Sequence, residues 1–140
     1  MFEPVHRMQI VLIEDSPADV MLVDMALREA GLDASVQVIQ DGEMAVTFVG
    51  GLNEDPTAQP VDLFLLDLNL PKCNGEDILK RLRASERHAQ TPVIVMTSSD
   101  APKDREKARK HAALHFRKPS DLSQYMQLGS IVRDLLGSQP

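Results

Sequence analysis

Five short segments have the hydrophobic pattern of β-strands. Residues 8–13, 61–67 and 93–96 are almost continuously apolar, whereas 34–39 and 114–117 alternate apolar and polar positions. An unbroken apolar run is typical of a strand buried on both faces of a parallel sheet, and alternation indicates a strand nearer the edge. The pattern therefore predicts five strands, with 61–67 near the middle of the sheet.

Between these segments, apolar residues recur at the spacing of a helix that covers a sheet. Serine, aspartate or asparagine, or proline, stands where each helix is expected to begin. The fourth helix, over 103–112, is nearly all polar, and Gly50 to Pro60 is expected to be a loop. The predicted starts are Ser16–Pro17, Asp41, Asn74 or Gly75, Asp100 to Pro102, and Ser120 or Asp121, with the last helix running to Leu136.

Strands and helices alternate from one end of the chain to the other. This order is typical of an α/β fold with a doubly wound parallel sheet. A chain of 140 residues is the size of one ordinary domain. We therefore predict a single domain over 1–140, with a core over about 8–136.

Composition excludes several functional classes. The chain is 43% hydrophobic and 26% charged, as in soluble globular proteins. No apolar run approaches the ~20 residues of a membrane helix, and the first nine residues lack a signal peptide's apolar stretch, so we expect a cytoplasmic protein without membrane contact. The net charge of −6 argues against binding nucleic acid. Cys73 is alone, which excludes an internal disulfide, and His6, His88 and His111 are expected at the surface.

Polar residues with chemical potential follow four of the predicted strands. Glu14 and Asp15 follow the first, Asp67 ends the third, Thr97 follows the fourth and Lys118 the fifth. Right-handed crossovers bring all these strand ends to one edge of the sheet, where ligands bind in such folds. Each residue alone has a plainer explanation: a helix cap, a turn hydroxyl or a surface lysine. Together they favour one site.

Three carboxylates at one edge repel one another. At ~4 Å and an effective dielectric constant near 20, each pair costs about 4 kcal/mol. A hard divalent cation removes this cost, and carboxylates with a carbonyl suit Mg²⁺. Glu14, Asp15 and Asp67 are the candidate ligands, with the carbonyl of Asn69 as a further one. Zinc is not expected, because the histidines are scattered.

A carboxylate beside Mg²⁺ is a nucleophile for phosphoryl groups. Asp67 would attack, and Lys118 and the Thr97 hydroxyl would contact the other oxygens of the transferred group. The sequence thus predicts phosphoryl transfer to Asp67.

These motifs resemble the receiver domain of two-component response regulators. The resemblance covers residues 8–136 and rests on Glu14-Asp15, on Asp67 with Pro71 and Gly75, on Thr97-Ser98 and on Lys118-Pro119. It implies a flavodoxin-like sheet with strand order 2-1-3-4-5 and five helices. It also implies that the phosphoryl group comes from a partner histidine kinase.

The resemblance assigns roles to single residues. Asp67 matches the phosphoacceptor, Glu14 and Asp15 the acidic pair, and Lys118 the family's lysine. Thr97 matches the switch hydroxyl, and the carbonyl of Asn69 completes the Mg²⁺ ligands. His115 stands where the family commonly has a rotating Tyr or Phe. The Lys118–Pro119 bond is often cis in this family, and a cis bond would fit a tight turn here. The stretch from Glu14 to Asp19 further resembles stand-alone regulators that pair with bacteriophytochromes.

The output is expected at the face formed by the fourth helix, fifth strand and fifth helix, by partner binding or dimerisation. Met126, Ile131 and Leu136 widen the apolar stripe of the last helix, which indicates either a homodimer surface or a well-buried helix. Two alternatives stay open. One is a receiver-like module that binds partners without phosphorylation. The other is an aspartate-nucleophile phosphohydrolase, which Asn69 disfavours because such enzymes have a second Asp there. No turnover of an external substrate is expected.

Overall fold

In the computed structural model, five parallel strands form one sheet in the predicted order β2-β1-β3-β4-β5. The structure describes residues 7–55, 57, 60–71, 73–99 and 101–137. The strands are β1 (Met8–Ile13), β2 (Ala34–Ile39), β3 (Leu63–Asp67), β4 (Val93–Thr97) and β5 (Leu114–Arg117). The helices are α1 (Pro17–Glu29), α2 (Gly42–Glu54), α3 (Gly75–Ala84), α4 (Pro102–Lys110), α5 (Leu122–Tyr125) and α6 (Gln127–Gly137).

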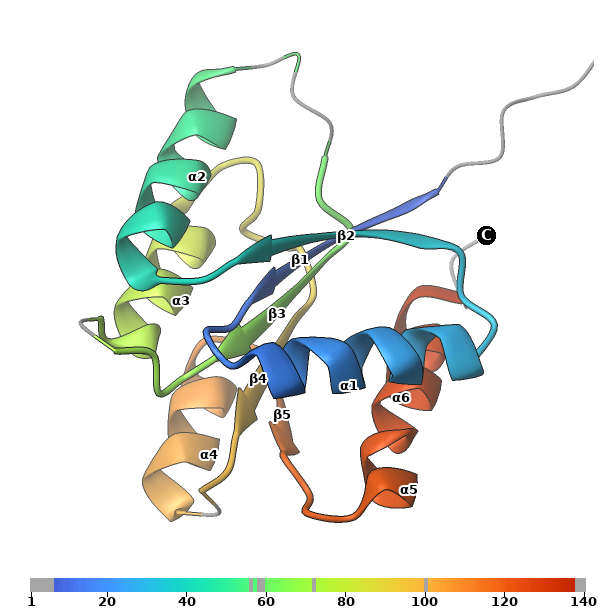
Figure 1. Ribbon diagram of the computed structural model, residues 1–140. Coiled ribbons are helices and arrows are strands. Elements are labelled where there is room, and N and C mark those ends of the chain that lie inside the picture. Colours follow the sequence, from blue (N-terminus) through green and yellow to red (C-terminus); the bar gives the residue numbers. More distant parts are fainter. Residues whose placement is uncertain (1–6, 56, 58–59, 72, 100, 138–140) are drawn as a thin grey trace, which may run out of the picture.

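The helices cover both faces of the sheet (Figure 1). Successive side chains of a strand point to opposite faces. One core cluster therefore joins residues of β1, β3 and β4 to α2, α3 and α4. A second joins the alternate residues of the same strands to α1, α5 and α6. The doubly wound fold predicted from the sequence is confirmed.

Strand β3 lies at the centre of the sheet, between β1 and β4. All five of its residues are buried, from Leu63 to Asp67. Ile13 of β1 is opposite Leu66, and Asp67 is opposite Met96 of β4. The acidic end of the most apolar segment is thus fixed by hydrogen-bonded strands on both sides.

Helix α2 is longer than predicted, because residues 50–54 continue the helix. The expected loop from Gly50 to Pro60 is therefore wrong in its first half. Leu52 explains the extension, since one more helical turn buries it in the core at 7% exposure. Burial of a leucine side chain offsets the ~1 kcal/mol that each glycine costs inside a helix.

The predicted last helix is divided at Met126 into α5 and α6. The backbone N–H of Gly129 donates to the Met126 carbonyl, three residues back, which tightens the turn. Met126, Ile131 and Leu136 pack against the core cluster of α1 and are partly buried. This packing accounts for the wide apolar stripe within one molecule, and the homodimer stays a prediction.

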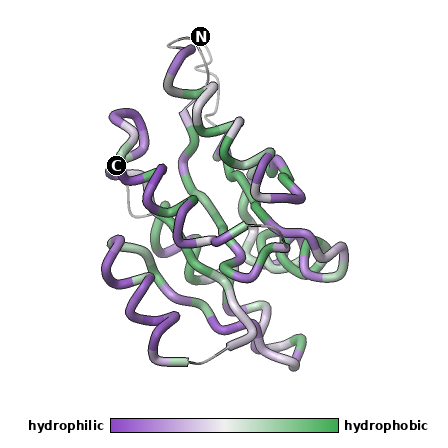
Figure 2. The backbone as a smooth tube through the Cα atoms, turned by 90° about the vertical axis from the view of Figure 1, so that its left-hand side faces the viewer, coloured by the Kyte–Doolittle hydropathy of each residue, from purple (hydrophilic) through white to green (hydrophobic). Residues whose placement is uncertain are grey.

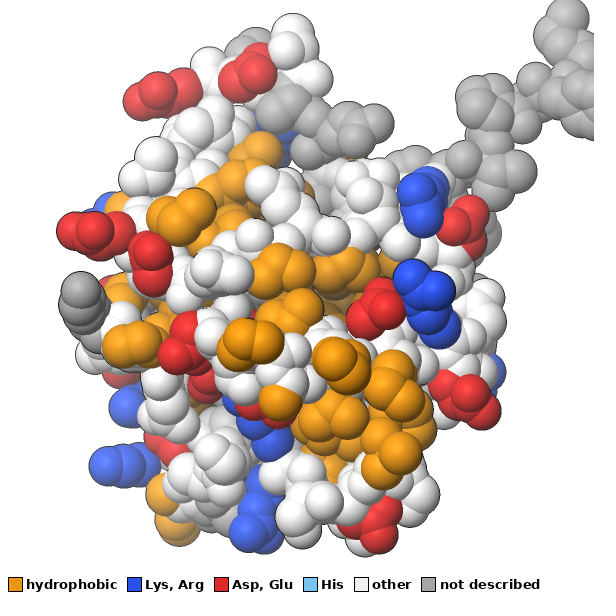
Figure 3. Space-filling view, in the orientation of Figure 1, with side chains coloured by type: hydrophobic (Ala, Val, Ile, Leu, Met, Phe, Trp, Pro, Cys, Tyr) orange, Lys and Arg blue, Asp and Glu red, His pale blue; other side chains and the backbone are white. Residues whose placement is uncertain are grey.

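Helix α4 is hydrophilic along almost its whole length (Figure 2). Ala108 is its one apolar residue buried in the core, and no side chain among the described residues caps its first turn. By contrast, apolar side chains gather at the surface near α1 (Figure 3), where Met21 is 63% exposed.

No helix in the described part of the chain has the length and apolar character to cross a bilayer.

The expectation that His88 lies at the surface is wrong, because its side chain is only 1% exposed. Its ring packs edge-on against Phe64, with centroids 5.2 Å apart. Nδ1 is 3.1 Å from the Thr91 hydroxyl, and Nε2 has no hydrogen-bond partner among the described residues. Periodicity gave no sign of this burial because His88 lies in the connection after α3. His111 is half-buried, with Nε2 3.2 Å from Glu76, and His6 lies outside the described residues.

Burial lowers the pKa of His88, with a smaller contribution from the charge of Arg87. The unfolded chain then takes up a proton near pH 6.5 that the folded protein resists, so stability is present above that pH and is lost below it. We expect the free energy of unfolding of the wild type to fall below pH 6.5 by up to about 1.4 kcal/mol per pH unit more than that of His88→Asn. Urea unfolding between pH 7.5 and 5.5 measures both, and parallel curves would contradict burial of a neutral ring.

Candidate phosphoacceptor site

Backbone hydrogen bonds bring the strand ends to one edge of the sheet. The N–H of Glu14 donates to the Ile39 carbonyl at 2.9 Å, which continues the ladder between β1 and β2. The N–H of Lys118 donates to the Thr97 carbonyl at 2.8 Å, which continues the ladder between β4 and β5. The functional side chains therefore start from rigid, paired backbone.

Lys118 is the centre of the side-chain contacts at this edge. Its ammonium donates a hydrogen bond to Glu14 Oε1, and it lies 3.1 Å from Asp19 Oδ2 and 3.4 Å from Asp67 Oδ2. Its side chain is 11% exposed, and that of Glu14 is 1% exposed. The predicted convergence of residues far apart in the sequence is thus present in the structure, although their roles stay predictions.

Asp15 completes a group of three acids. Carboxylate oxygens of Glu14, Asp15 and Asp67 lie within 4.8 Å of one another, with Asp15 exposed and the other two buried. Oxygen ligands in this number suit a hard divalent cation such as Mg²⁺. The donor set therefore fits the metal that the sequence predicts.

The charges at the site do not balance within the described residues. Burial and, to a smaller extent, the neighbouring Asp67 carboxyl raise the pKa of Glu14 to about 8, against the opposing effect of Lys118. Burial alone would lower the pKa of Lys118, but Glu14 and Asp67 shift it above its ordinary value. Lys118 is therefore a permanent cation that cannot by itself neutralise the surrounding acids.

Thr97 connects two loops at the site. Its side chain is fully buried, and its Oγ1 accepts hydrogen bonds from Asn69 Nδ2 and from the Ser99 N–H, both at 3.0 Å. Asn69 also donates its backbone N–H to Asp67 Oδ1 at 2.9 Å. Only the carbonyl of Asn69 was expected at the site, whereas its side-chain amide also contacts the Thr97 hydroxyl.

His115 lies on β5 opposite Val95 and is half-buried. Strand alternation turns its side chain away from the cluster that holds Phe116, toward the α4 face. Its role as the switch residue stays a prediction.

The expectation of a cis bond between Lys118 and Pro119 is wrong, because no cis peptide bond occurs in the described residues. The backbone continues the direction of β5 at this point, and the N–H of Lys118 donates to the Thr97 carbonyl.

Asp19 is a site residue that the sequence analysis did not select. It lies in the first turn of α1, where Ser16 Oγ accepts its backbone N–H. One carboxylate oxygen contacts Lys118, and the other accepts a hydrogen bond from the Tyr125 hydroxyl at 3.2 Å. Its place in the first turn of the helix that directly follows Glu14 and Asp15 was the available signal.

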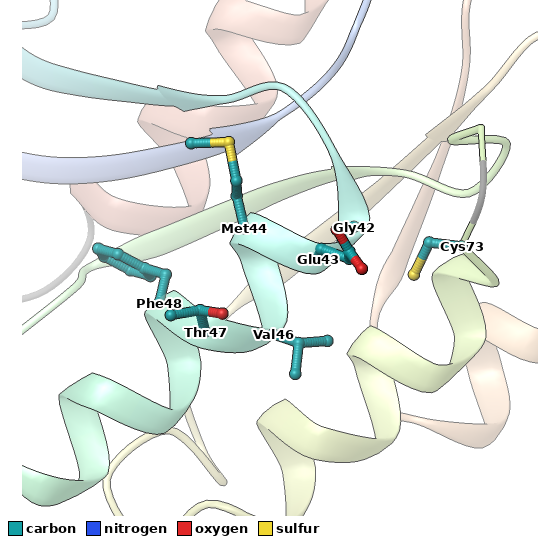
Figure 4. A pocket seen from close by; sticks show the side chains of 7 residues that line it. All are labelled: Gly42, Glu43, Met44, Val46, Thr47, Phe48 and Cys73. Atoms are coloured by element: carbon teal, nitrogen blue, oxygen red, sulfur yellow. The ribbon is translucent and has the colours of Figure 1, made fainter.

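A separate cavity of about 730 Å³ lies between the first turns of α2 and Cys73 (Figure 4). Met44 and Phe48 line it, together with Gly42. Burial raises the pKa of the Cys73 thiol, so it is a weak nucleophile. This cavity lacks the converging acids of the strand-end site.

Comparisons with known proteins agree with this geometry. A model of the response regulator receiver domain matches residues 10–128. Response regulator Rcp1 from Synechocystis is 36% identical over 90 residues, which are 64% of this chain and 61% of Rcp1. The chain thus matches less than two thirds of that relative's length.

Two solved structures share both the fold and detectable sequence identity. The phosphorylated cyanobacterial phytochrome response regulator RcpA superposes with a TM-score of 0.83 at 28% identity, covering 96% of this chain and 97% of RcpA. The receiver domain of the sensor histidine kinase PA1611 from Pseudomonas aeruginosa has a TM-score of 0.73 at 26% identity, covering 95% of this chain and all of the other. That structure has a magnesium ion coordinated in its active site cleft.

We expect Lys118→Met to lower the free energy of unfolding at pH 7 by about 3 kcal/mol, because removing one partner of a buried ion pair leaves the other charges uncompensated. Denaturant unfolding in metal-free buffer measures the change. Lys103→Met, at an exposed position of α4, is the control and should change it by less than about 0.5 kcal/mol. Equal effects of the two substitutions would contradict the central position of Lys118.

Proposed function

The chain belongs to the response regulator receiver domain family, and from this premise we propose that it accepts a phosphoryl group from a histidine kinase on Asp67. The observation that carries the proposal is the buried Asp67 carboxylate between Lys118 and the acids Glu14 and Asp15. Receiver domains are signalling proteins rather than classical enzymes, and we propose that this chain promotes only its own phosphorylation and dephosphorylation.

In the proposed reaction, an oxygen of Asp67 attacks the phosphorus of a phosphohistidine. A P–O bond forms as the P–N bond breaks, and the imidazole leaves with the electron pair of that bond. Lys118 would bind the developing negative charge, and the Thr97 hydroxyl would donate to a phosphoryl oxygen. Glu14, Asp15, Asp67 and the Asn69 carbonyl would hold Mg²⁺, which neutralises charge on the transferred group.

The proposed conformational output starts at Thr97. Phosphorylation gives the site a charge of about −2 and three acceptor oxygens, by analogy with other phosphoresidues. If Thr97 turns toward them, Ser99 loses the hydroxyl that holds its N–H. Ser99 Oγ in turn accepts the N–H of Ala101, the residue before α4, at 3.0 Å. The change would reach the face of α4, β5 and α5, with His115 beside it, and alter partner binding or dimerisation.

The name of RcpA suggests a partner. RcpA is a phytochrome response regulator, and we propose that the cognate kinase of this chain is a bacteriophytochrome. The buried carboxylate beside Lys118 and two further acids favours phosphorylation over a module that only binds partners. A phosphohydrolase would need a second acid where Asn69 stands.

Mass spectrometry after incubation with Mg²⁺ and acetyl phosphate tests the proposal. We expect the added mass of one phosphoryl group, labile to base, that is absent in Asp67→Asn and when EDTA removes the metal. Asp24→Asn removes a half-exposed acid of α1 that pairs with Arg28, away from the site, and should be phosphorylated like the wild type. An unmodified wild-type mass with several phosphodonors would instead favour the binding-only alternative.

A further inference from the structure

Asp19 connects the phosphoacceptor site to the last two helices. Its two carboxylate oxygens have different partners: Oδ2 is 3.1 Å from Lys118 Nζ, and Oδ1 accepts from the Tyr125 hydroxyl at 3.2 Å. Lys118 in turn lies 3.4 Å from Asp67. One short chain of contacts therefore runs from the phosphoacceptor to the end of α5.

Tyr125 is placed to respond to a change at Asp19. Its side chain is 1% exposed and packs against Phe116, with ring centroids 5.8 Å apart. Asp19 is the hydrogen-bond partner of its hydroxyl among the described residues. A buried hydroxyl that loses its partner is unfavourable, so the ring must move if the carboxylate leaves.

The packing of the surrounding helices determines which element a movement of Tyr125 displaces. Gly129 of α6 lies so close to α1 that a Cβ there would come within 2.1 Å of the Ala26 carbonyl oxygen. α6 is therefore held firmly on α1. α5 has only four residues and is separated from α6 by the turn at Met126, directly after Tyr125. Movement of Tyr125 displaces this junction more easily than it displaces α6.

Phosphorylation creates competition for the Lys118 ammonium. An ammonium has three N–H donors, and Glu14, Asp19 and Asp67 surround it. A phosphoryl group on Asp67 adds acceptor oxygens and negative charge, so Lys118 moves toward it. As the ammonium moves, its contact with Glu14 or with Asp19 lengthens.

Asp19 is the carboxylate that can yield. Its side chain is 23% exposed and can turn to water, whereas that of Glu14 is 1% exposed. Asp19 is also outside the group of three acids that suits a metal, so a cation does not hold it in place. The negative charge of the phosphoryl group repels it as well.

We propose that Asp19 is a positioning residue that transmits phosphorylation of Asp67 to the junction of α5 and α6, by losing Lys118 to the phosphoryl group and releasing the Tyr125 hydroxyl. This inference rests on the proposed function. It adds a second route, through α1, to the one that starts at Thr97.

The chain has a single tyrosine and no tryptophan, so incorporated fluorotyrosine reports on Tyr125 alone. Fluorine NMR of the full chain, before and after acetyl phosphate and Mg²⁺, should show one resonance that shifts on phosphorylation. Asp19→Asn should lose most of this shift at a phosphorylated fraction matched by mass spectrometry. Asp24→Asn, the same change at a half-exposed position of α1 away from the site, should keep it.

The outcomes separate the two proposals. A phosphorylated wild type with an unmoved resonance, or an equal shift in Asp19→Asn, overturns the role of Asp19 and leaves phosphorylation intact. A wild type that gains no phosphoryl mass overturns both.

A second variant covers the case in which Asp19→Asn is not phosphorylated. Tyr125→Phe keeps the ring and removes only the hydroxyl. In the phosphorylated wild type, amides of residues 122–132 should exchange hydrogen faster than in the unmodified protein. Phosphorylated Tyr125→Phe should lack this difference, and an unchanged difference overturns the proposal.

Discussion

The concentration of negative charge at one edge of the sheet is the constraint on which the rest of the site depends. Parallel strands deliver Glu14, Asp15 and Asp67 to the same edge, where burial makes their mutual repulsion costly. Lys118 relieves part of it through contacts with residues that are up to 104 positions away in the sequence. The remaining negative charge therefore favours binding of a cation. Lys118 is also available to bind a phosphoryl group more strongly than it binds the carboxylates.

Hydrogen bonds connect this acidic site to helices on both faces of the sheet. Thr97 is connected through Ser99 to the start of α4, a polar helix with little apolar contact to the core. Asp19 lies on the opposite face, between Lys118 and the α5–α6 junction. Both connections end at elements that are held weakly. Helix α5 has only four residues, and α4 has few buried side chains. Elements of this kind move at low cost in free energy.

Much of this arrangement could be predicted from the sequence, because it depends on local patterns. The apolar runs, the caps Ser16, Asp41 and Asn74, and the polar strand ends fixed the sheet and the residues at its edge. The remaining features depend on contacts between distant segments. Leu52 extends α2 because a core position lies beneath it, and His88 is buried by a connection without periodicity. Asp19 is a site residue only because Lys118 and Tyr125 reach it from the other end of the chain.

A crystal structure with Mn²⁺ in place of Mg²⁺ tests most directly whether the acids at the strand ends bind a divalent cation. Anomalous scattering locates this metal independently of the protein density. We expect a single strong peak at the strand ends, with ligands from Glu14, Asp15 and Asp67 and from the Asn69 carbonyl. Metal bound at another part of the chain, with these carboxylates pointing apart, would contradict it.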